Sequence, residues 1–439
     1  MYQDKYMMYL EALKHPFQKL SRLEFLNPDD SVAFALDNNY NRGYRSRYDS
    51  RAFIQTGNLN VSLQNGQRRK ANISLANIDD AFEYSVNHIW FGSRVRLSMG
   101  LVLPDGTDFY LPQGVFYFKD PQAIRTPTQK EISYSLVDKW SYLDGGLFGV
   151  LPYTYEVAIG TNIFVGMQKV LNLDRRNIKS LATANEWKID PTPPVFTDYY
   201  NNLPDVEYEV EDANGNLTVK TAKANETAFT TTVSMGSKAS DILLDLNRNI
   251  VGWIGYDQTG ALRVDPSQDD IVDADKPILW TFSPANSQLA SSNETVKNSD
   301  VFNDVIVIGE STTGGAVYGR ATNYDPISDT NVNLIGLKTH TENRAEYWNS
   351  KQCVDYADWL LKRKTVLQKS VSISSSQIFH LVENRLIAVV RSDKKGSPVE
   401  RHVIQSFSLP IGETGNMTIN AVSTNDFPIA TKVTSEIDE

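Results

Sequence analysis

The single cysteine and the five histidines are the first candidates for catalytic or metal chemistry in this sequence. Cys353 could act as a nucleophile if His380 or His402 served as its base. However, Cys353 lies inside a predicted helix, with no helix N-terminus nearby to lower the pKa of its thiol, which favours a packed and unreactive cysteine. With one cysteine, the chain can form neither a disulfide framework nor a multi-cysteine zinc or iron–sulfur site.

A metal centre built from histidines is not expected either. The sequence contains no His-Glu-x-x-His and no Cys-x-x-Cys, the spacings that bring several ligands to one metal. The histidines are scattered along the chain at His15, His88, His340, His380 and His402. We therefore expect no metal and no cofactor.

Adjacent acidic residues could supply the two carboxylates that a glycosidase places across its cleft. The candidate pairs are Asp29-Asp30, Asp79-Asp80 and Asp269-Asp270. Neighbours in a strand point to opposite faces, and aspartates are common in turns, so turns are the simpler interpretation. The segment Gly309–Gly315 resembles the start of a phosphate-binding loop, but Gly315 and Ala316 occupy the positions of its Lys and Ser/Thr. It predicts a hairpin tip, and we expect no enzyme activity.

The sharpest local charge feature is a stretch in which arginines alternate with tyrosines. This candidate interface loop contains Tyr40, Arg42, Tyr44, Arg45, Arg47, Tyr48 and Arg51. Such side chains can stack on the bases of a nucleic-acid single strand. Because Tyr and Arg are also favoured in protein interfaces, we prefer a loop that docks onto an acidic neighbouring protein.

The composition predicts a folded protein of about three domains. Hydrophobic residues make up 41% of the 439 residues and aromatics 10%, which excludes general disorder and a coiled coil. The sequence has 43 Lys and Arg against 53 Asp and Glu, which gives a net charge of −10. This charge excludes the positive surface potential of a dedicated nucleic-acid-binding protein. The first residues are too charged for a signal peptide. The most apolar stretch, 147–166, contains Pro152 and Glu156, so we expect no membrane insertion.

The elements that would position these residues begin with a helical arm over 1–18 and continue as strands. Alternating apolar residues predict a hairpin of 59–63 with 71–75, and Asn65-Gly66 supplies the positive φ values of a type I′ turn. Further strands of period two at 95–99, 110–117 and 132–136 predict a first antiparallel barrel over 19–145.

The periodicity then changes twice along the chain. Helical spacing over Asn162–Asn172 and Ser237–Trp253 predicts an α/β insert at 146–276. Strand alternation returns afterwards and predicts a second barrel over 277–425 with an inserted helix at 342–364, followed by a flexible tail at 426–439. The expected fold class is mainly β with α/β inserts: two antiparallel β-barrel tube domains plus peripheral α/β domains.

Several long segments carry a resemblance to a known family. They are Ile54–Arg69, Ile89–Gly92, Leu111–Phe116 and Leu136–Trp140 in the first half, and Val301–Gly309, Asn323–Pro326 and Cys353–Arg363 in the second. Through these segments the chain resembles the gene-27-like baseplate-hub or tail-tip proteins of tailed bacteriophages of Gram-positive hosts.

This resemblance implies a homotrimer whose two barrels per subunit alternate around a ring. The ring would cap the tail tube, adapt sixfold to threefold symmetry and open for genome ejection. The implied partners are a hexamer of tail tube or distal tail protein above, a tape measure protein in the lumen, and fibre, spike or receptor-binding proteins below. The implied location is the virion tail, assembled in the host cytoplasm. DNA would pass without sequence-specific binding, which suits an acidic wall.

A second class of function stays open from the residues alone. A tail-associated cell-wall hydrolase, or a protein that binds carbohydrate or a receptor, would account for the aromatic content and the aspartate pairs. The resemblance to the hub family makes the structural hub the leading hypothesis and this class the alternative.

Overall fold

The structure is a computed structural model that describes residues 2–435 with gaps. Residues outside the description are 1, 28–29, 39–53, 78–79, 81, 84–88, 90–91, 128–129, 177, 203–204, 212–215, 224, 228–229, 268–275, 285–288, 297–300, 312–313, 346, 366–368, 393, 413, 425–430 and 436–439. No helix in the described ranges is long and apolar enough to cross a membrane.

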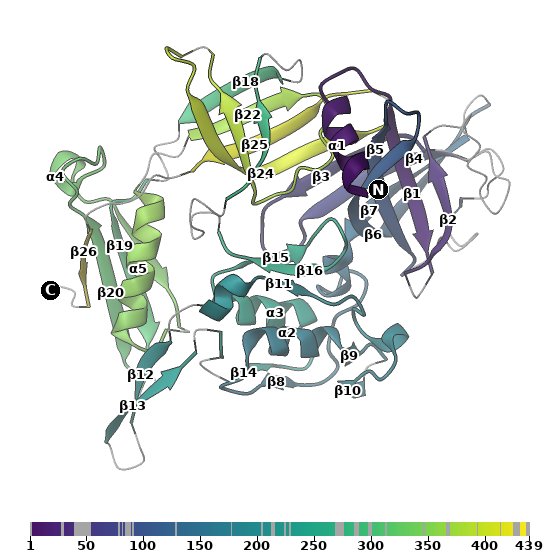
Figure 1. Ribbon diagram of the computed structural model, residues 1–439. Helices are drawn as coiled ribbons and strands as arrows, with labels where there is room; N and C mark the ends of the chain where they lie inside the picture. Colours follow the sequence, from purple (N-terminus) through teal and green to yellow (C-terminus); the bar gives the residue numbers. More distant parts are fainter. Residues whose placement is uncertain are drawn as a thin grey trace.

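A single large sheet dominates the structure (Figure 1). Its strands from the first half of the chain are β1 (Lys19–Leu26), β2 (Val32–Asp37), β3 (Ile54–Ser62), β4 (Arg69–Ala76), β5 (Arg94–Val102), β6 (Asp108–Arg125) and β7 (Lys130–Asp138). Its strands from the second half are β17 (Ile278–Phe282), β18 (Leu289–Val296), β22 (Lys369–Ser375), β23 (Leu386–Val390), β24 (Val399–Ile411) and β25 (Met417–Ser423). Within the described residues these form one 13-stranded sheet.

The two expected barrels are not confirmed, because the halves share this sheet. Strand β24 pairs antiparallel with β3, with Leu409 opposite Leu59, and so joins the C-terminal strands to the N-terminal ones. No closed barrel is found among the described strands. Alternation in the sequence identifies a strand and its inner face, but the choice of neighbouring strand depends on contacts far apart in the chain.

The predicted Asn-Gly hairpin is confirmed and shows how the inner face forms. Strands β3 and β4 pair antiparallel on either side of the turn, and alternate residues of β4 (Ala71, Ile73, Leu75) are buried. The helix α1 (Tyr2–Ala12) packs on the core behind this sheet. Tyr9 is fully buried, its hydroxyl lies 2.9 Å from His380 Nδ1, and it accepts a hydrogen bond of 3.1 Å from the Phe379 N–H.

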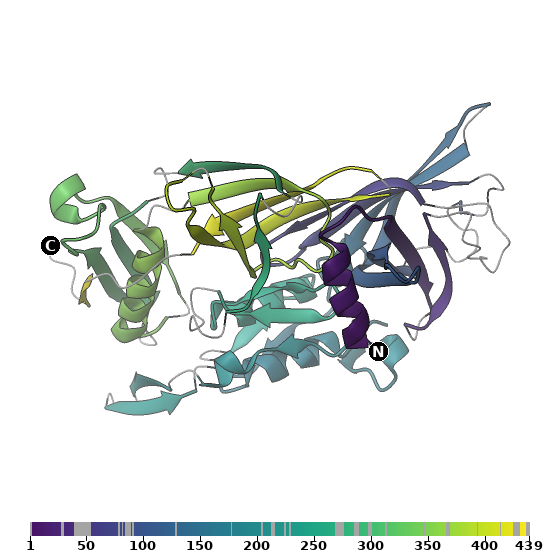
Figure 2. The same ribbon diagram turned by 45° about the horizontal axis from the view of Figure 1, so that its top comes forward.

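An α/β region, defined here as residues 139–265, lies below the large sheet in Figure 1. Its helical elements are η2 (Lys139–Tyr142), α2 (Ile163–Leu171), η3 (Asn185–Trp187), η4 (Asp198–Asn202) and α3 (Ala239–Arg248). Its strands are β8 (Tyr155–Val157), β9 (Leu173–Asp174), β10 (Ile178–Leu181), β11 (Val195–Phe196), β12 (Val206–Glu211), β13 (Leu217–Ala222), β14 (Thr231–Val233), β15 (Trp253–Tyr256) and β16 (Leu262–Asp265). The β12–β13 hairpin extends away from the rest (Figure 2).

The two predicted helices of this region are present, and the second is shorter than expected. Asn162 caps α2 by accepting hydrogen bonds from the Phe164 and Val165 N–H groups. The pattern predicts a second helix as far as Trp253, whereas α3 ends at Arg248. The residues after it turn into β15, and Trp253 pairs with Asp265 of β16. Helices α2 and α3 bury their apolar faces in a second hydrophobic core.

A third unit, called here the α5 sheet, consists of α5 (Ser350–Lys364) packed on β19 (Asp304–Glu310), β20 (Ala316–Asn323), β21 (Thr339–Asn343) and β26 (Thr431–Thr434), with α4 (Val332–Ile335) at one end. It divides the expected second barrel, since these strands form a sheet separate from the large one. The predicted glycine-rich hairpin tip is confirmed between β19 and β20.

The ends of two predicted elements differ from the structure here. The helix expected over 342–364 begins at Ser350, because Asn349 caps it by accepting from the Gln352 N–H, while Glu342 belongs to β21. Within the segment expected to be a flexible tail, Thr431–Thr434 form β26 and pair with β20. That strand carries Thr and Val at alternate positions, a pattern too short to stand out in the sequence.

Candidate functional site

The predicted interface loop falls outside the described residues. All seven of its tyrosines and arginines lie within 39–53: Tyr40, Arg42, Tyr44, Arg45, Arg47, Tyr48 and Arg51. Its role as a docking element therefore stays a prediction.

The structure does not bring Cys353 together with either candidate base, His380 or His402. Cys353 is a residue of α5 and is buried in the core between this helix and its sheet. Burial raises the pKa of its thiol to about 11. His380 instead packs against Tyr9 of α1. His402 is buried on β24, where loss of solvent lowers its pKa. Within the described part of the chain, no group of three His, Cys, Asp or Glu side chains could hold a metal ion.

The aspartate pairs lie in turns wherever the structure describes them. Asp30 and Asp80 both have positive φ, at 65° and 59°, a conformation common for aspartate in tight turns. Asp30 pairs with Arg94 at 2.8 Å, and Asp80 lies 3.9 Å from Arg125. Asp29, Asp79, Asp269 and Asp270 lie outside the described residues. The turn interpretation therefore holds for the two described members.

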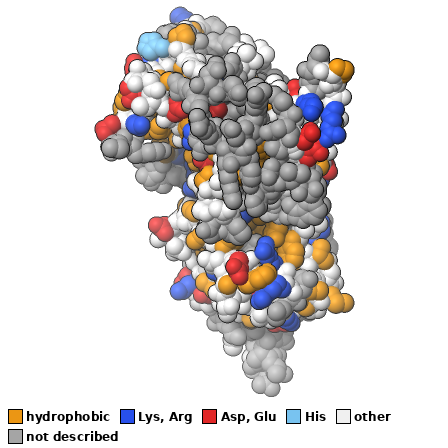
Figure 3. Space-filling model, turned by 90° about the vertical axis from the view of Figure 1, so that its right-hand side faces the viewer, with side chains coloured by type: hydrophobic (Ala, Val, Ile, Leu, Met, Phe, Trp, Pro, Cys, Tyr) orange, Lys and Arg blue, Asp and Glu red, His pale blue; other side chains and the backbone are white. Residues whose placement is uncertain are grey.

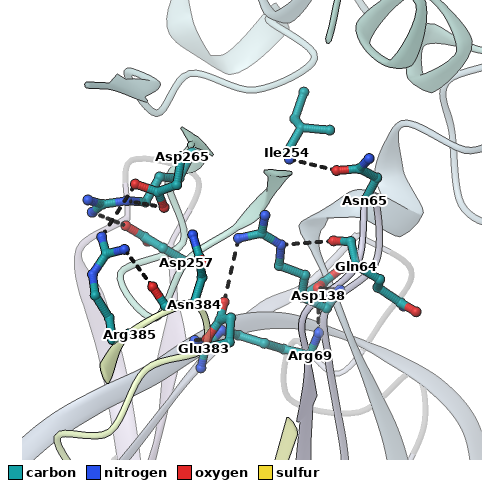
Figure 4. Close-up of polar contacts among 12 residues, drawn as sticks. Gln64, Asn65, Arg69, Asp138, Ile254, Asp257, Asp265, Glu383, Asn384 and Arg385 are labelled. Atoms are coloured by element: carbon teal, nitrogen blue, oxygen red, sulfur yellow. Dashed lines mark hydrogen bonds and ion pairs between the residues drawn. The ribbon is translucent and has the colours of Figure 1, made fainter. Parts of the chain in front are cut away.

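A buried, charged contact joins the large sheet to the α/β region (Figure 4). We call it the junction and define it as residues 64–69, 138–140, 190–192, 254–266 and 383–385. At its edge the tip of the β3–β4 hairpin docks on β15. Asn65 Oδ1 accepts from the Ile254 N–H at 2.9 Å, and the Gly66 N–H donates to the Ile254 carbonyl at 3.0 Å.

Gly66 is required at this contact for two reasons. Its φ of +99° belongs to the region that side-chain-bearing residues avoid, whereas Asn65 has no positive φ, so the predicted type I′ turn, which needs both, is wrong. In addition, a Cβ on Gly66 would lie 3.1 Å from Nε1 of Trp140, the ring on which the tip rests. The turn that closes the hairpin is therefore also the part that contacts the second core.

Arg68, just before β4, and Arg69, its first residue, lie at the centre of the junction. Arg69 donates to Oε2 of Glu383 at 2.6 Å and to the Gln113 carbonyl at 2.9 Å, with 1% of its surface exposed. Arg68 donates from Nε to the Gln64 carbonyl at 3.0 Å, and its Nη1 lies 3.6 Å from Glu383. Burial lowers the pKa of Arg68. One carboxylate thus serves two guanidinium groups.

Asp138 ends β7 and holds the same two arginines by their backbone. Its Oδ2 accepts from the Arg68 and Arg69 N–H groups at 2.9 and 2.8 Å, and its Oδ1 accepts from the Trp140 N–H at 3.1 Å. Burial raises the pKa of Asp138 to about 6, and these three hydrogen bonds oppose the rise because they favour the carboxylate.

Lys139, the next residue, forms a second buried ion pair on the side of the α/β region. Its Nζ donates to Asp190 Oδ1 at 2.6 Å, to Thr192 Oγ1 at 2.7 Å and to the Gly260 carbonyl at 3.0 Å. Asp190 Oδ2 also accepts from the Tyr256 hydroxyl at 2.7 Å. Asp138 therefore bonds to the large sheet, and its neighbour Lys139 bonds to the α/β region.

The loop before β23 completes the junction. Asn384 donates to the Pro266 carbonyl at 2.8 Å, and Arg385 Nη2 lies 3.3 Å from Asp265 Oδ1. Arg263 donates to the other oxygen of Asp265 at 2.7 Å. The second half of the chain thus reaches β16 of the α/β region as well as β4 of the large sheet.

The ion pairs and hydrogen bonds of the junction are structural. Asp138, Asp190 and Glu383 are each at most 3% exposed, and each accepts from arginine, lysine or backbone donors. A carboxylate held in this way cannot reach a substrate or exchange protons with one. The junction is therefore arranged to hold segments distant in sequence in fixed positions.

Sequence reasoning finds the hairpin and misses the junction. Arg68, Arg69 and the Asp138-Lys139-Trp140 run stand out in the sequence only as parts of the segments that carry the family resemblance. The available signal is a pair of arginines directly after an Asn-Gly turn, and an Asp-Lys pair at the end of an apolar strand. Charged residues flanked by apolar strand positions indicate burial with partners, but do not reveal that the partners are Glu383 and Asp190.

A cleft of about 450 Å³ opens beside the junction between the large sheet and the α/β region. Tyr117 and Tyr142 stack along it with centroids 5.1 Å apart, and Arg175 donates to the Tyr142 hydroxyl at 3.1 Å. Figure 3 views the side of β2, β9 and β10 and shows hydrophobic side chains beside Lys and Arg on its lower half. Arg94, which also lines the cleft, pairs with Asp30.

Comparison with known proteins shows similarity at the level of structure. No protein-family model matches the chain, and no curated protein sequence matches it. A tail protein from Neisseria meningitidis superposes with a TM-score of 0.55 at 10% identity, over 93% of this chain and 97% of that one. The 43 kDa tail protein of prophage MuSo2 from Shewanella oneidensis gives a TM-score of 0.53 at 10% identity, over 93% and 98%.

The chain has the fold of these tail proteins. The match extends over nearly the full length of both chains, so it includes the large sheet and the regions attached to it. An identity of 10% explains why the likeness appears in the arrangement of strands and not in a comparison of sequences.

Proposed function

We propose that this protein is a structural component of a bacteriophage tail and acts as its hub. The observation that supports the proposal most strongly is the shared fold, which spans 93% of this chain and 97% of a known tail protein. The junction fits this role, since its buried carboxylates hold segments together and are inaccessible to a substrate.

The finer proposal is a trimeric ring that caps the tail tube and adapts sixfold to threefold symmetry. Each subunit carries two β halves of similar size, seven strands from residues 19–138 and six from 278–423 in the described sheet. Three such subunits would present six β halves to a sixfold tube. The ring would open for genome ejection, with a tape measure protein in its lumen and fibre, spike or receptor-binding proteins below.

The net charge of −10 supports passage of DNA through such a ring. A polyanion is repelled by an acidic wall and does not adhere to it, so DNA would move without sequence-specific binding. The loop over Tyr40–Arg51 would provide basic and aromatic groups for docking onto an acidic neighbour in the tail.

The mass of the purified protein in solution tests this function. Light scattering coupled to size-exclusion chromatography should give about 150 kDa, three times the 49.3 kDa chain. Electron micrographs of the same fraction should show a threefold ring. A zymogram on peptidoglycan should show no lytic band. A monomer that lyses the cell wall would contradict the proposal and favour the hydrolase alternative.

A further inference from the structure

A second cleft, of about 410 Å³, lies where the α/β region meets the α5 sheet. One wall comes from the end of α3 and the start of β15, the other from α5 and the residue after β21. Clefts of this size between separately packed units are the usual place for small-molecule sites. The junction residues that form ion pairs do not line it.

The lining of this cleft combines guanidinium groups with indole rings. Three arginines (Arg248, Arg344, Arg363) and two tryptophans (Trp253, Trp359) line it, and no Asp or Glu is among its described lining residues. Planar guanidinium groups bind phosphate or carboxylate through paired hydrogen bonds. Indole faces pack against the apolar side of a ring.

The arginines are held in place by their neighbours. Arg363 lies over the Trp359 ring, 3.7 Å from its centroid, and donates to the Trp359 carbonyl at 2.9 Å. Arg344 bonds to Glu342 and to the Tyr356 hydroxyl. Arg248 lies 3.0 Å from Asp245 on α3, and 62% of its side chain is exposed. A ligand would therefore meet oriented cations and one accessible arginine at the rim.

Neutral hydrogen-bonding groups complete the lining. Asn65 Oδ1 is used by the Ile254 N–H, so this residue offers its amide nitrogen to a ligand. Asn247 is 3% exposed and donates to the Gly252 carbonyl at 2.6 Å, which fixes the loop before Trp253. Val251 in that loop has a φ of +50°, costly for a branched residue, and packs against the α5 core.

We propose that this cleft binds an anionic saccharide, that is, a sugar carrying a phosphate or a carboxylate. Arg248 and Arg363 would hold the anion, the Trp253 indole the apolar face of the sugar ring, and the Asn65 amide nitrogen one of its hydroxyls. A nucleic-acid strand offers similar groups, but the net charge of −10 opposes the approach of a long polyanion. The inference goes beyond the proposed function and does not depend on it.

Fluorescence titration of the purified full chain tests the site, because two tryptophans line it. Glucose 1-phosphate and glucuronate are the probes, and they distinguish phosphate from carboxylate. We expect a saturable change with at least one probe, and at least tenfold weaker binding of glucose and of inorganic phosphate. Arg248→Ala and Arg363→Ala should each weaken binding roughly tenfold, the typical loss for a charge-assisted hydrogen bond. Arg401→Ala, at an exposed arginine of β24, is the matched control and should bind normally.

Several results would overturn the proposal. One is the absence of saturation by both probes up to roughly 10 mM, the weak end of specific binding. Another is unchanged binding in both arginine variants after circular dichroism has shown that they fold. Inorganic phosphate binding as tightly as glucose 1-phosphate would reduce the site to an anion contact. An octathymidylate that binds more tightly than either sugar, and is weakened by Arg248→Ala, would assign the cleft to nucleic acid.

Discussion

Arg69 and Glu383 are 314 positions apart in the sequence, yet Arg69 Nη2 and Glu383 Oε2 lie 2.6 Å from each other. Both side chains are almost completely removed from solvent. The pair connects a strand of the first half of the large sheet to the loop that leads into β23. Because a buried charge without a partner lowers stability, removing either side chain should destabilise the fold through the charge that remains.

Replacing Glu383 by Gln should lower the free energy of unfolding by about 3–5 kcal/mol, since two buried guanidinium groups would lose their carboxylate. Denaturant unfolding followed by circular dichroism measures the change. Glu400→Gln is the matched control: this side chain is 22% exposed, pairs with Arg391 and Lys394, and should cost less than about 1 kcal/mol. The double variant Arg69→Met with Glu383→Met should be more stable than Glu383→Met alone, because only Arg68 would then lack its carboxylate. Equal losses in Glu383→Gln and Glu400→Gln would contradict the role of Glu383 as a buried counter-ion.

Asp138 should make stability depend on pH between about 4 and 7. Its pKa is about 6 in the folded protein, against roughly 3.9 in an unfolded chain. The folded state therefore binds the extra proton between these values, and its stability falls by up to about 3 kcal/mol as pH rises through 6. The stability difference between the wild type and Asp138→Asn should shrink over this range. Glu186→Gln, at an exposed carboxylate, should show no such trend, and a pH-independent difference for Asp138→Asn would refute the assignment.

Gly66→Ala should destabilise the protein more than the same change in a free turn. At Gly66 the new methyl group meets both a positive φ and the Trp140 ring. Gly106 has a φ of +80°, and a Cβ added there would meet no atom within 4 Å, so Gly106→Ala measures the backbone cost alone, about 1 kcal/mol. Thermal unfolding should show the larger loss for Gly66→Ala. Equal losses would mean that the hairpin tip gains nothing from resting on Trp140.

Gly319→Ala should expose Cys353 to thiol reagents. A Cβ on Gly319 would overlap the backbone of α5 at Cys353 and Val354, so the helix would have to move away from the sheet. In the wild type the buried thiol, with its pKa raised to about 11, should react with Ellman's reagent only after unfolding. Gly315→Ala, where the added methyl group meets nothing within 4 Å, is the control and should leave the thiol protected. Rapid labelling of the wild type would show that α5 is not held as described.

Local features of the sequence predicted local features of the fold. The Asn65-Gly66 turn, the β19–β20 hairpin and the helix after Asn162 are each specified by neighbouring residues, and each is present. The predicted start of α5 at residue 342 was wrong. The pattern over Thr339–Asn343 fits a helix or a strand, and pairing with β19 makes this segment a strand. The α5 sheet was predicted as part of a barrel because alternation does not indicate which sheet a strand joins.

The junction could not have been derived in the same way. Glu383, Asn384 and Arg385 form an ordinary polar turn when read alone, and so do Asp190 and Thr192. Their roles arise only when β24 pairs with β3 and brings the second half of the chain beside Arg69. The sequence indicates that charges near apolar strands need partners, and the fold supplies them.

The pairing of β24 with β3 also bears on how the chain is made. Ribosomes release the N-terminal strands first, and β3 has no partner on its outer side until residues 399–411 have emerged. An unpaired strand edge invites association with other chains. The nascent protein thus carries this edge while residues 63–398 are synthesised, and the large sheet can be completed only after β24 has emerged.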